Sequence, residues 1–162
     1  MLFRSWQQIG GQLTGQVRDG LVPANLQAVF ALESPALPEV IRDINKFSNN
    51  VMAQQLFLTL SLQARGSGNW DGSREALKTW WRDRIGGEAP VFDNGSGLSR
   101  EERVSALGLA RLLQFAWGSP TMSELMSSLP LSGLDGTLKR SKSQTIAHLK
   151  TGSLRDVAGI AG

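Results

Sequence analysis

The chain has 162 residues, of which 41% are hydrophobic and 19% are charged, and its formal net charge is +3. This length supports one hydrophobic core and is too short to suggest two, so we expect residues 1–162 to belong to one domain or to part of one. The chain has no cysteine and one histidine, which excludes disulfides, thiolate metal sites and a histidine zinc site. We therefore expect no metal and no cofactor.

The basic charge does not predict a nucleic-acid partner. Arginines alternate with carboxylates, as in Arg82-Asp83-Arg84, and only Lys139-Arg140-Ser141-Lys142 is a basic cluster. The cluster has no interleaved aromatic residue, so a solvated loop is the better interpretation. Residues 1–13 carry an arginine and three glutamines where a signal peptide needs an unbroken apolar run, and residues 51–62 are too short to cross a bilayer. We expect no signal peptide and no transmembrane segment in this chain.

The first half of the chain predicts short strands followed by helices. Residues 2–9 have the pattern of a helix that ends at Gly10-Gly11. Short strands are predicted over 12–18 and 26–32, an amphipathic helix over 35–46 and a second helix over 49–65. The second helix is apolar on nearly every side, which is typical of a helix buried inside a larger domain.

The second half predicts three more helices and one strand. A loop over 66–72 precedes a helix over 74–85, and a glycine-rich turn follows at 93–97. The pairs Ser99 with Glu102 and Thr121 with Glu124 have the spacing of capping boxes, and they predict a helix to Trp117 and a short helix that ends before Pro130. Alternating polar and apolar residues predict a strand over 144–152.

Two short motifs contain residues suited to chemistry. Ser48-Asn49-Asn50 lies between two predicted helices, and residues two apart on a helix face away from each other, so Ser48 and Asn50 act together only if the backbone leaves helical geometry there. The alternative is that Ser48 merely caps the second helix. Lys150-Thr151-Gly152-Ser153 ends the predicted strand, where a cation, a hydroxyl and a glycine that admits a ligand suit a peptide carboxylate.

The two stretches match Ser-x-Asn and Lys-Thr-Gly, two of the three motifs of serine β-lactamases and penicillin-binding proteins. They occur here in the order expected for those proteins. The chain resembles the class C, low-molecular-mass penicillin-binding proteins of the D-alanyl-D-alanine carboxypeptidase/endopeptidase family. The matching stretches are residues 42–53, 93–100 and 148–154. The resemblance implies an α+β fold of the β-lactamase/transpeptidase type, of which this chain holds the helical side, the Lys-Thr-Gly strand and an incomplete sheet.

The resemblance also implies roles for these residues. Ser48 corresponds to the hydroxyl that relays a proton, Asn50 to the amide that binds the substrate's peptide group, and Lys150 to the cation beside the relay. Thr151 and Ser153 correspond to ligands of the terminal carboxylate, and the Ser153 backbone N–H to an oxyanion donor.

The third motif, Ser-x-x-Lys, is missing. The residues three positions before the five lysines are Asp43, Glu75, Gly136, Lys139 and Ala147. In the family that motif lies far upstream, and the sheet continues beyond Lys-Thr-Gly, so the resemblance implies a fragment truncated at both ends. We expect it to be inactive by itself because it lacks the acylated serine.

The resemblance implies that the parent enzyme hydrolyses peptidoglycan stem peptides ending in D-Ala-D-Ala, binds β-lactams and lies in the periplasm or cell envelope. The alternative is a non-catalytic module that binds peptidoglycan or a partner protein.

Overall fold

The computed structural model describes residues 6–12, 14–16, 18–143 and 145–162, which form two units, Met1–Ser34 and Pro35–Gly162. In the first unit residues 6–8 are helical, as predicted, while residues 2–5 of that prediction lie outside the described part. The strands predicted over 12–18 and 26–32 are wrong for the described residues, which are irregular there. Strands this short need partners to bury a face, and the described residues of this unit supply none.

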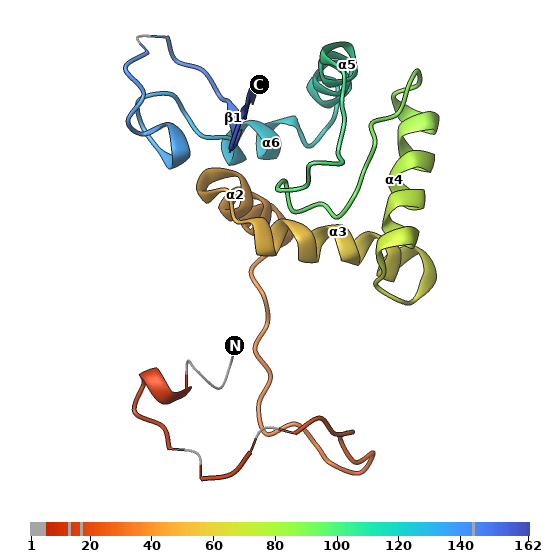
Figure 1. Ribbon diagram of the computed structural model, residues 1–162, viewed down its shortest axis with the longest axis vertical. Helices are drawn as coiled ribbons and strands as arrows, with labels where there is room; N and C mark the ends of the chain where they lie inside the picture. The colour runs from red at the N-terminus through yellow and green to blue at the C-terminus, as the bar shows by residue number, and fades with distance from the viewer. Residues whose placement is uncertain (1–5, 13, 17, 144) are drawn as a thin grey trace. The chain divides into compact units, whose positions relative to one another are not determined.

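The second unit consists of helices followed by a strand pair (Figure 1). Its elements are α2 (Leu37–Phe47), α3 (Asn50–Arg65), α4 (Trp70–Arg84), α5 (Ala106–Trp117), α6 (Met122–Ser128), the 3-10 helix η1 (Gly136–Leu138), β1 (Lys150–Leu154) and β2 (Val157–Ala161). The predicted helices over 35–46 and 49–65 are confirmed. Helix α4 begins four residues before its predicted start, because Asn69 caps it and accepts a hydrogen bond from Gly72 N at 2.8 Å.

Both predicted capping boxes differ from the structure. The helix expected after Ser99 begins at Ala106, where Ser105 Oγ accepts a hydrogen bond from Gly108 N at 3.0 Å. Helix α6 begins directly after Thr121, as predicted, but Thr121 makes no capping hydrogen bond, since its hydroxyl pairs with Ser119 Oγ at 2.9 Å.

The strand predicted over 144–152 lies further along the chain. Strand β1 covers 150–154 and pairs antiparallel with β2, so that Gly152 faces Gly159. Before β1, His148 forms a single bridge with Leu131, and Leu149 N donates to Pro130 O at 2.9 Å. The segment that precedes β1 therefore pairs with a loop rather than with a strand.

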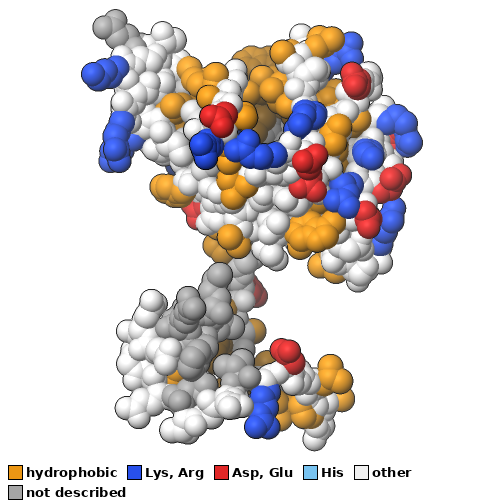
Figure 2. Space-filling view, in the orientation of Figure 1, with side chains coloured by type: hydrophobic (Ala, Val, Ile, Leu, Met, Phe, Trp, Pro, Cys, Tyr) orange, Lys and Arg blue, Asp and Glu red, His pale blue; other side chains and the backbone are white. Residues whose placement is uncertain are grey.

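The core of the second unit is small. The buried hydrophobic residues are Ile44, Phe57, Trp81 and Leu129. In α3, whose pattern is typical of a helix buried inside a larger domain, Val51 is 59% exposed and Leu62 is 47% exposed. The described residues of this chain therefore cover only part of its apolar surface. On the face shown in Figure 2, basic and acidic side chains are interspersed, with exposed hydrophobic side chains between them. Among the described residues, none of the helices combines the length and the hydropathy that crossing a membrane requires.

Candidate active site

The junction of α2 and α3 presents Ser48 and Asn50 on either side of a break in helical geometry. Ser48 ends α2 in the left-handed conformation, with φ 53° and ψ 50°, and Asn49 is extended. Asn49 rather than Ser48 caps α3, because its side-chain oxygen accepts a hydrogen bond from Met52 N at 3.1 Å. The predicted departure from helical geometry is confirmed, and the interpretation of Ser48 as the N-terminal cap of the second helix is wrong, because Ser48 is the C-terminal cap of α2. Residues other than glycine in the left-handed conformation are strained, and they cluster at functional sites.

The Asn50 side chain is oriented by a loop far away in the sequence. Its Nδ2 donates a hydrogen bond to Ser96 O at 2.6 Å. With Nδ2 occupied, Oδ1 has no hydrogen-bond partner among the described residues, and an amide oxygen of this kind accepts a hydrogen bond from a peptide N–H. The geometry therefore suits recognition of a peptide group by Asn50.

The loop that holds Asn50 depends on residues that sequence reasoning did not assign to the site. Glu102 Oε1 accepts hydrogen bonds from Asp93 N at 3.4 Å and from Gly95 N at 3.3 Å. Arg74 of α4 donates to Asp93 O at 2.9 Å. Gly95 has φ +70°, and a methyl group there would collide with Phe57 of α3. The family resemblance over residues 93–100 includes Asp93 and Gly95, but it gave no signal for Glu102 or Arg74.

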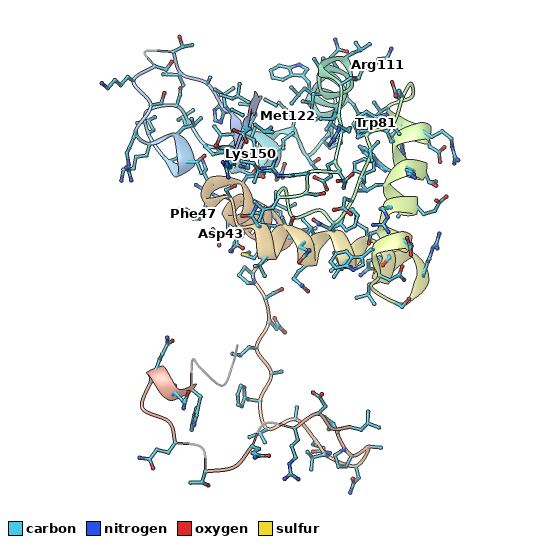
Figure 3. All side chains as sticks on the ribbon, in the orientation of Figure 1. Asp43, Phe47, Trp81, Arg111, Met122 and Lys150 are labelled. Atoms are coloured by element: carbon cyan, nitrogen blue, oxygen red, sulfur yellow. The ribbon has the colours of Figure 1, made fainter. Side chains whose placement is uncertain are left out.

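Lys150 of β1 reaches the end of α2. Its Nζ donates to Ser48 Oγ at 3.2 Å and to Thr151 O at 2.7 Å, and Figure 3 shows Lys150 close to the end of α2 that carries Phe47. Burial lowers the pKa of Lys150 below that of an exposed lysine. Among the described residues no carboxylate forms a salt bridge with it. A cation without a counter-ion beside a hydroxyl favours negative charge at that point.

The rest of the Lys-Thr-Gly-Ser motif is accessible. Thr151 and Ser153 lie on the same face of β1, since side chains alternate along a strand. Thr151 Oγ1 lies 3.0 Å from Thr137 Oγ1. A methyl group added to Gly152 would meet nothing within 4 Å, so packing of the described residues does not require a glycine there. A ligand that approaches the strand backbone closely would require a glycine at this position.

A buried lysine joins α2 to the segment before β1. Lys46 is 7% exposed, and its Nζ donates to Leu129 O at 2.7 Å and to Asp135 Oδ2 at 2.6 Å. Asp135 also accepts a hydrogen bond from Leu131 N at 2.7 Å. The Lys46 hydrogen bond, followed by that from Leu131 N, holds the pKa of the Asp135 carboxyl below its usual range. This network fixes the segment that pairs with His148, and with it the start of β1.

The structure thus brings Ser48 and Lys150 into contact. Asn50 is bonded to Ser96 and Thr151 to Thr137, while Ser153 is exposed. Within the described residues no group of three or more His, Asp or Glu side chains is arranged to hold a metal ion.

Two solved structures with a similar fold are of a penicillin-binding protein. The chain is similar to penicillin binding protein 4 (dacB) from Haemophilus influenzae, with a TM-score of 0.67 and 27% identity over 78% of this chain and 30% of that one. A second structure of that protein, complexed with a β-lactam, matches with a TM-score of 0.77 over 98% of this chain and 38% of that one; at 23% identity it shows the fold alone. The fold is therefore part of the α+β DD-peptidase fold, as predicted, and the chain is of the low-molecular-mass penicillin-binding class.

Over residues 1–162 the chain matches the D-Ala-D-Ala carboxypeptidase 3 (S13) family, and it belongs to that family. It is 32% identical to the D-alanyl-D-alanine carboxypeptidase of Actinomadura sp. (strain R39), over 94% of this chain and 31% of that protein. It is 26% identical to the D-alanyl-D-alanine carboxypeptidase DacB of Haemophilus influenzae, over 100% of this chain and 36% of that protein. The chain thus spans about a third of the length of these relatives.

Proposed function

We propose that this chain carries part of the active site of a serine-type D-Ala-D-Ala carboxypeptidase. The observation that carries the proposal is the 3.2 Å hydrogen bond between Lys150 Nζ and Ser48 Oγ. A cation at this distance stabilises charge that develops on the hydroxyl while a proton passes through it. Ser48 is therefore suited to deliver a proton to the amine that leaves when the peptide bond breaks.

The remaining motif residues bind the substrate in this proposal. Asn50 Oδ1 accepts a hydrogen bond from a peptide N–H, because its Nδ2 is held by Ser96. The hydroxyls of Thr151 and Ser153 bind the terminal carboxylate, and Gly152 lets the peptide end approach the strand. The Ser153 backbone N–H is one of the donors to the oxyanion of the tetrahedral intermediate.

The reaction transfers the acyl group of a D-Ala-D-Ala peptide to a serine hydroxyl with release of D-alanine, and then to water. No lysine of this chain has a serine three residues before it, so the chain contains no Ser-x-x-Lys nucleophile. We propose that a polypeptide of these 162 residues forms no acyl-enzyme and does not turn over substrate by itself. Residues 1–162 would then be one part of a larger DD-peptidase domain.

The substrates proposed for the complete enzyme are peptidoglycan stem peptides ending in D-Ala-D-Ala, with β-lactams as acylating inhibitors. The family and the 27% identity to penicillin binding protein 4 of Haemophilus influenzae support this proposal. Because peptidoglycan lies outside the cytoplasmic membrane, we place the enzyme in the periplasm or cell envelope.

Intact-mass spectrometry with a reporter penicillin tests the first part of the proposal. The 162-residue chain is expected to show no covalent adduct. A stoichiometric adduct would mean that a serine of this chain, Ser48 first, is the nucleophile, and the assigned roles would be wrong.

A chimera tests the catalytic roles and separates them from the alternative of a non-catalytic binding module. In it, residues 1–162 replace the matching stretch of the Actinomadura enzyme. The chimera is expected to be acylated by penicillin, and Ser48→Ala to slow acylation by about 100-fold or more. Ser119→Ala, which removes a half-buried hydroxyl near the start of α6, is the control and is expected to have no effect. A folded chimera that is never acylated would favour the binding module.

A further inference from the structure

Thr137 lies beside the proposed carboxylate site although no motif includes it. Its Oγ1 is 3.0 Å from Thr151 Oγ1, and neither hydroxyl has another hydrogen-bond partner among the described residues. We propose that Thr137 is a positioning residue for substrate recognition, which acts by orienting the Thr151 hydroxyl. This inference rests on the proposed function, in which Thr151 binds the terminal carboxylate.

The chemistry of hydroxyl groups gives the reason. A carboxylate only accepts hydrogen bonds, and a threonine hydroxyl has a single proton to donate. When Thr137 donates to Thr151, the oxygen of Thr151 is occupied as an acceptor and its own proton is available to a ligand. A donor whose oxygen also accepts a hydrogen bond is polarised and binds an anion more strongly. Thr137 therefore sets both the direction and the strength of the Thr151 donor.

The position of Thr137 is fixed by contacts with α2 rather than by the strand. Gly136, the residue before it, has φ +54°, and an added Cβ would lie 2.6 Å from Lys46 O, so only glycine fits between η1 and the end of α2. Asp135, one residue earlier, forms the ion pair with Lys46 at 2.6 Å. Two adjacent residues thus hold η1 against the helix that ends at Ser48.

These contacts close a ring around the site. Lys150 bonds to Ser48 at the end of α2, and Thr151 bonds to Thr137, which is held to the same helix end through Gly136 and Asp135. The end of α2 therefore positions both hydroxyls: that of Thr151, which binds the carboxylate, and that of Ser48, which relays the proton. Such a frame fixes where the peptide end lies relative to Ser48.

The test measures binding of N-acetyl-D-Ala-D-Ala and of its C-terminal amide to the full 162-residue chain by NMR titration. Thr137→Val removes the hydroxyl with little change in shape, at an exposed position. It is expected to weaken binding of the carboxylate peptide about three- to tenfold, the value of one hydrogen bond, and to leave binding of the amide unchanged. Thr137→Ser keeps the hydroxyl and is expected to bind as the wild type does.

Thr121→Val is the matched control, because Thr121 also pairs its hydroxyl with another hydroxyl, that of Ser119, at 2.9 Å. It is expected to change neither affinity. Equal loss for the carboxylate and the amide in Thr137→Val, or no loss at all, would overturn the role of Thr137 while leaving the proposed function in place. A wild-type chain that does not prefer the carboxylate over the amide would overturn the proposed function, and this inference with it.

Discussion

The Lys150 ammonium and the Ser48 hydroxyl lie 3.2 Å apart, although 102 residues separate them in the sequence. The contact places a partly buried cation, without a carboxylate partner in the described residues, next to the hydroxyl of a serine whose backbone is in the left-handed conformation. Burying such a charge destabilises the fold. The arrangement is therefore better explained by chemistry at this point than by stability.

Replacing Lys150 with methionine tests the cost of the buried charge. Burial lowers the pKa of Lys150, so the charged form opposes folding at every pH below its folded-state pKa. The penalty shrinks as the pH rises from that value toward the ordinary lysine pKa of about 10.4, because the unfolded chain then binds more protons than the folded one. The stability of the wild type relative to Lys150→Met is expected to rise over this interval in urea unfolding experiments. A difference that stays constant with pH would contradict the prediction.

Gly152→Ala separates a glycine needed for function from one needed for folding. A methyl group at Gly152 meets nothing within 4 Å, so the free energy of unfolding of the variant is expected to lie within about 0.5 kcal/mol of that of the wild type. Its binding of N-acetyl-D-Ala-D-Ala is expected to weaken, because the methyl group blocks the approach to the strand. Gly95→Ala is the contrasting variant, with an expected destabilisation of about 1–3 kcal/mol from the positive φ and the collision with Phe57. Equal stabilities for the two variants would show that the loop packing is wrong.

Lys46→Met tests the link between α2 and the segment before β1. The variant leaves Leu129 O and Asp135 without their shared donor. We therefore expect the free energy of unfolding at pH 7 to fall by about 1–3 kcal/mol. The pKa of Asp135 is held below its usual range, so its contribution is fully present above about pH 4 and is lost as the pH falls through the folded-state value. The difference between the wild type and the variant is therefore expected to shrink in acid. A difference that grows on acidification would contradict the ion pair.

Asn50→Ala tests the hold of the 93–97 loop on the Asn50 side chain. Loss of the hydrogen bond to Ser96 O is expected to cost about 1 kcal/mol and to speed hydrogen exchange in the loop. Gln55→Ala, which removes an exposed amide from the same helix, is the control and should leave both quantities within error. The same exchange rates in both variants would mean that the loop is held by Glu102 and Arg74 alone.

Several local features of the fold follow from sequence patterns because they depend on neighbouring residues. The apolar spacing over 35–46 and 49–65 predicted α2 and α3 nearly to the residue. The position of Ser48-Asn49-Asn50 between the two predicted helices, together with the requirement that Ser48 and Asn50 act together, predicted the break there. Periodicity and backbone sterics are local, so the printed sequence contains all that these predictions need.

The capping box predicted at Ser99 does not form, because distant residues engage its glutamate. Glu102 does not fold back onto a helix start, because its carboxylate accepts hydrogen bonds from Asp93 N and Gly95 N. Arg103 beside it pairs with Val91 in a short antiparallel bridge. The pattern of a capping box was present, and tertiary contacts used the same residues for another purpose.

By itself the sequence determined the family, the approximate positions of most helices and the presence of the Ser-x-Asn and Lys-Thr-Gly motifs without a Ser-x-x-Lys motif. Only the tertiary structure decided that Lys150 contacts Ser48, that Ser96 orients Asn50 and that Thr137 stands behind Thr151. These pairs lie 102, 46 and 14 positions apart. Contacts at such separations depend on how helices, loops and the strand pack against one another, which the pattern of residues within any single element does not specify.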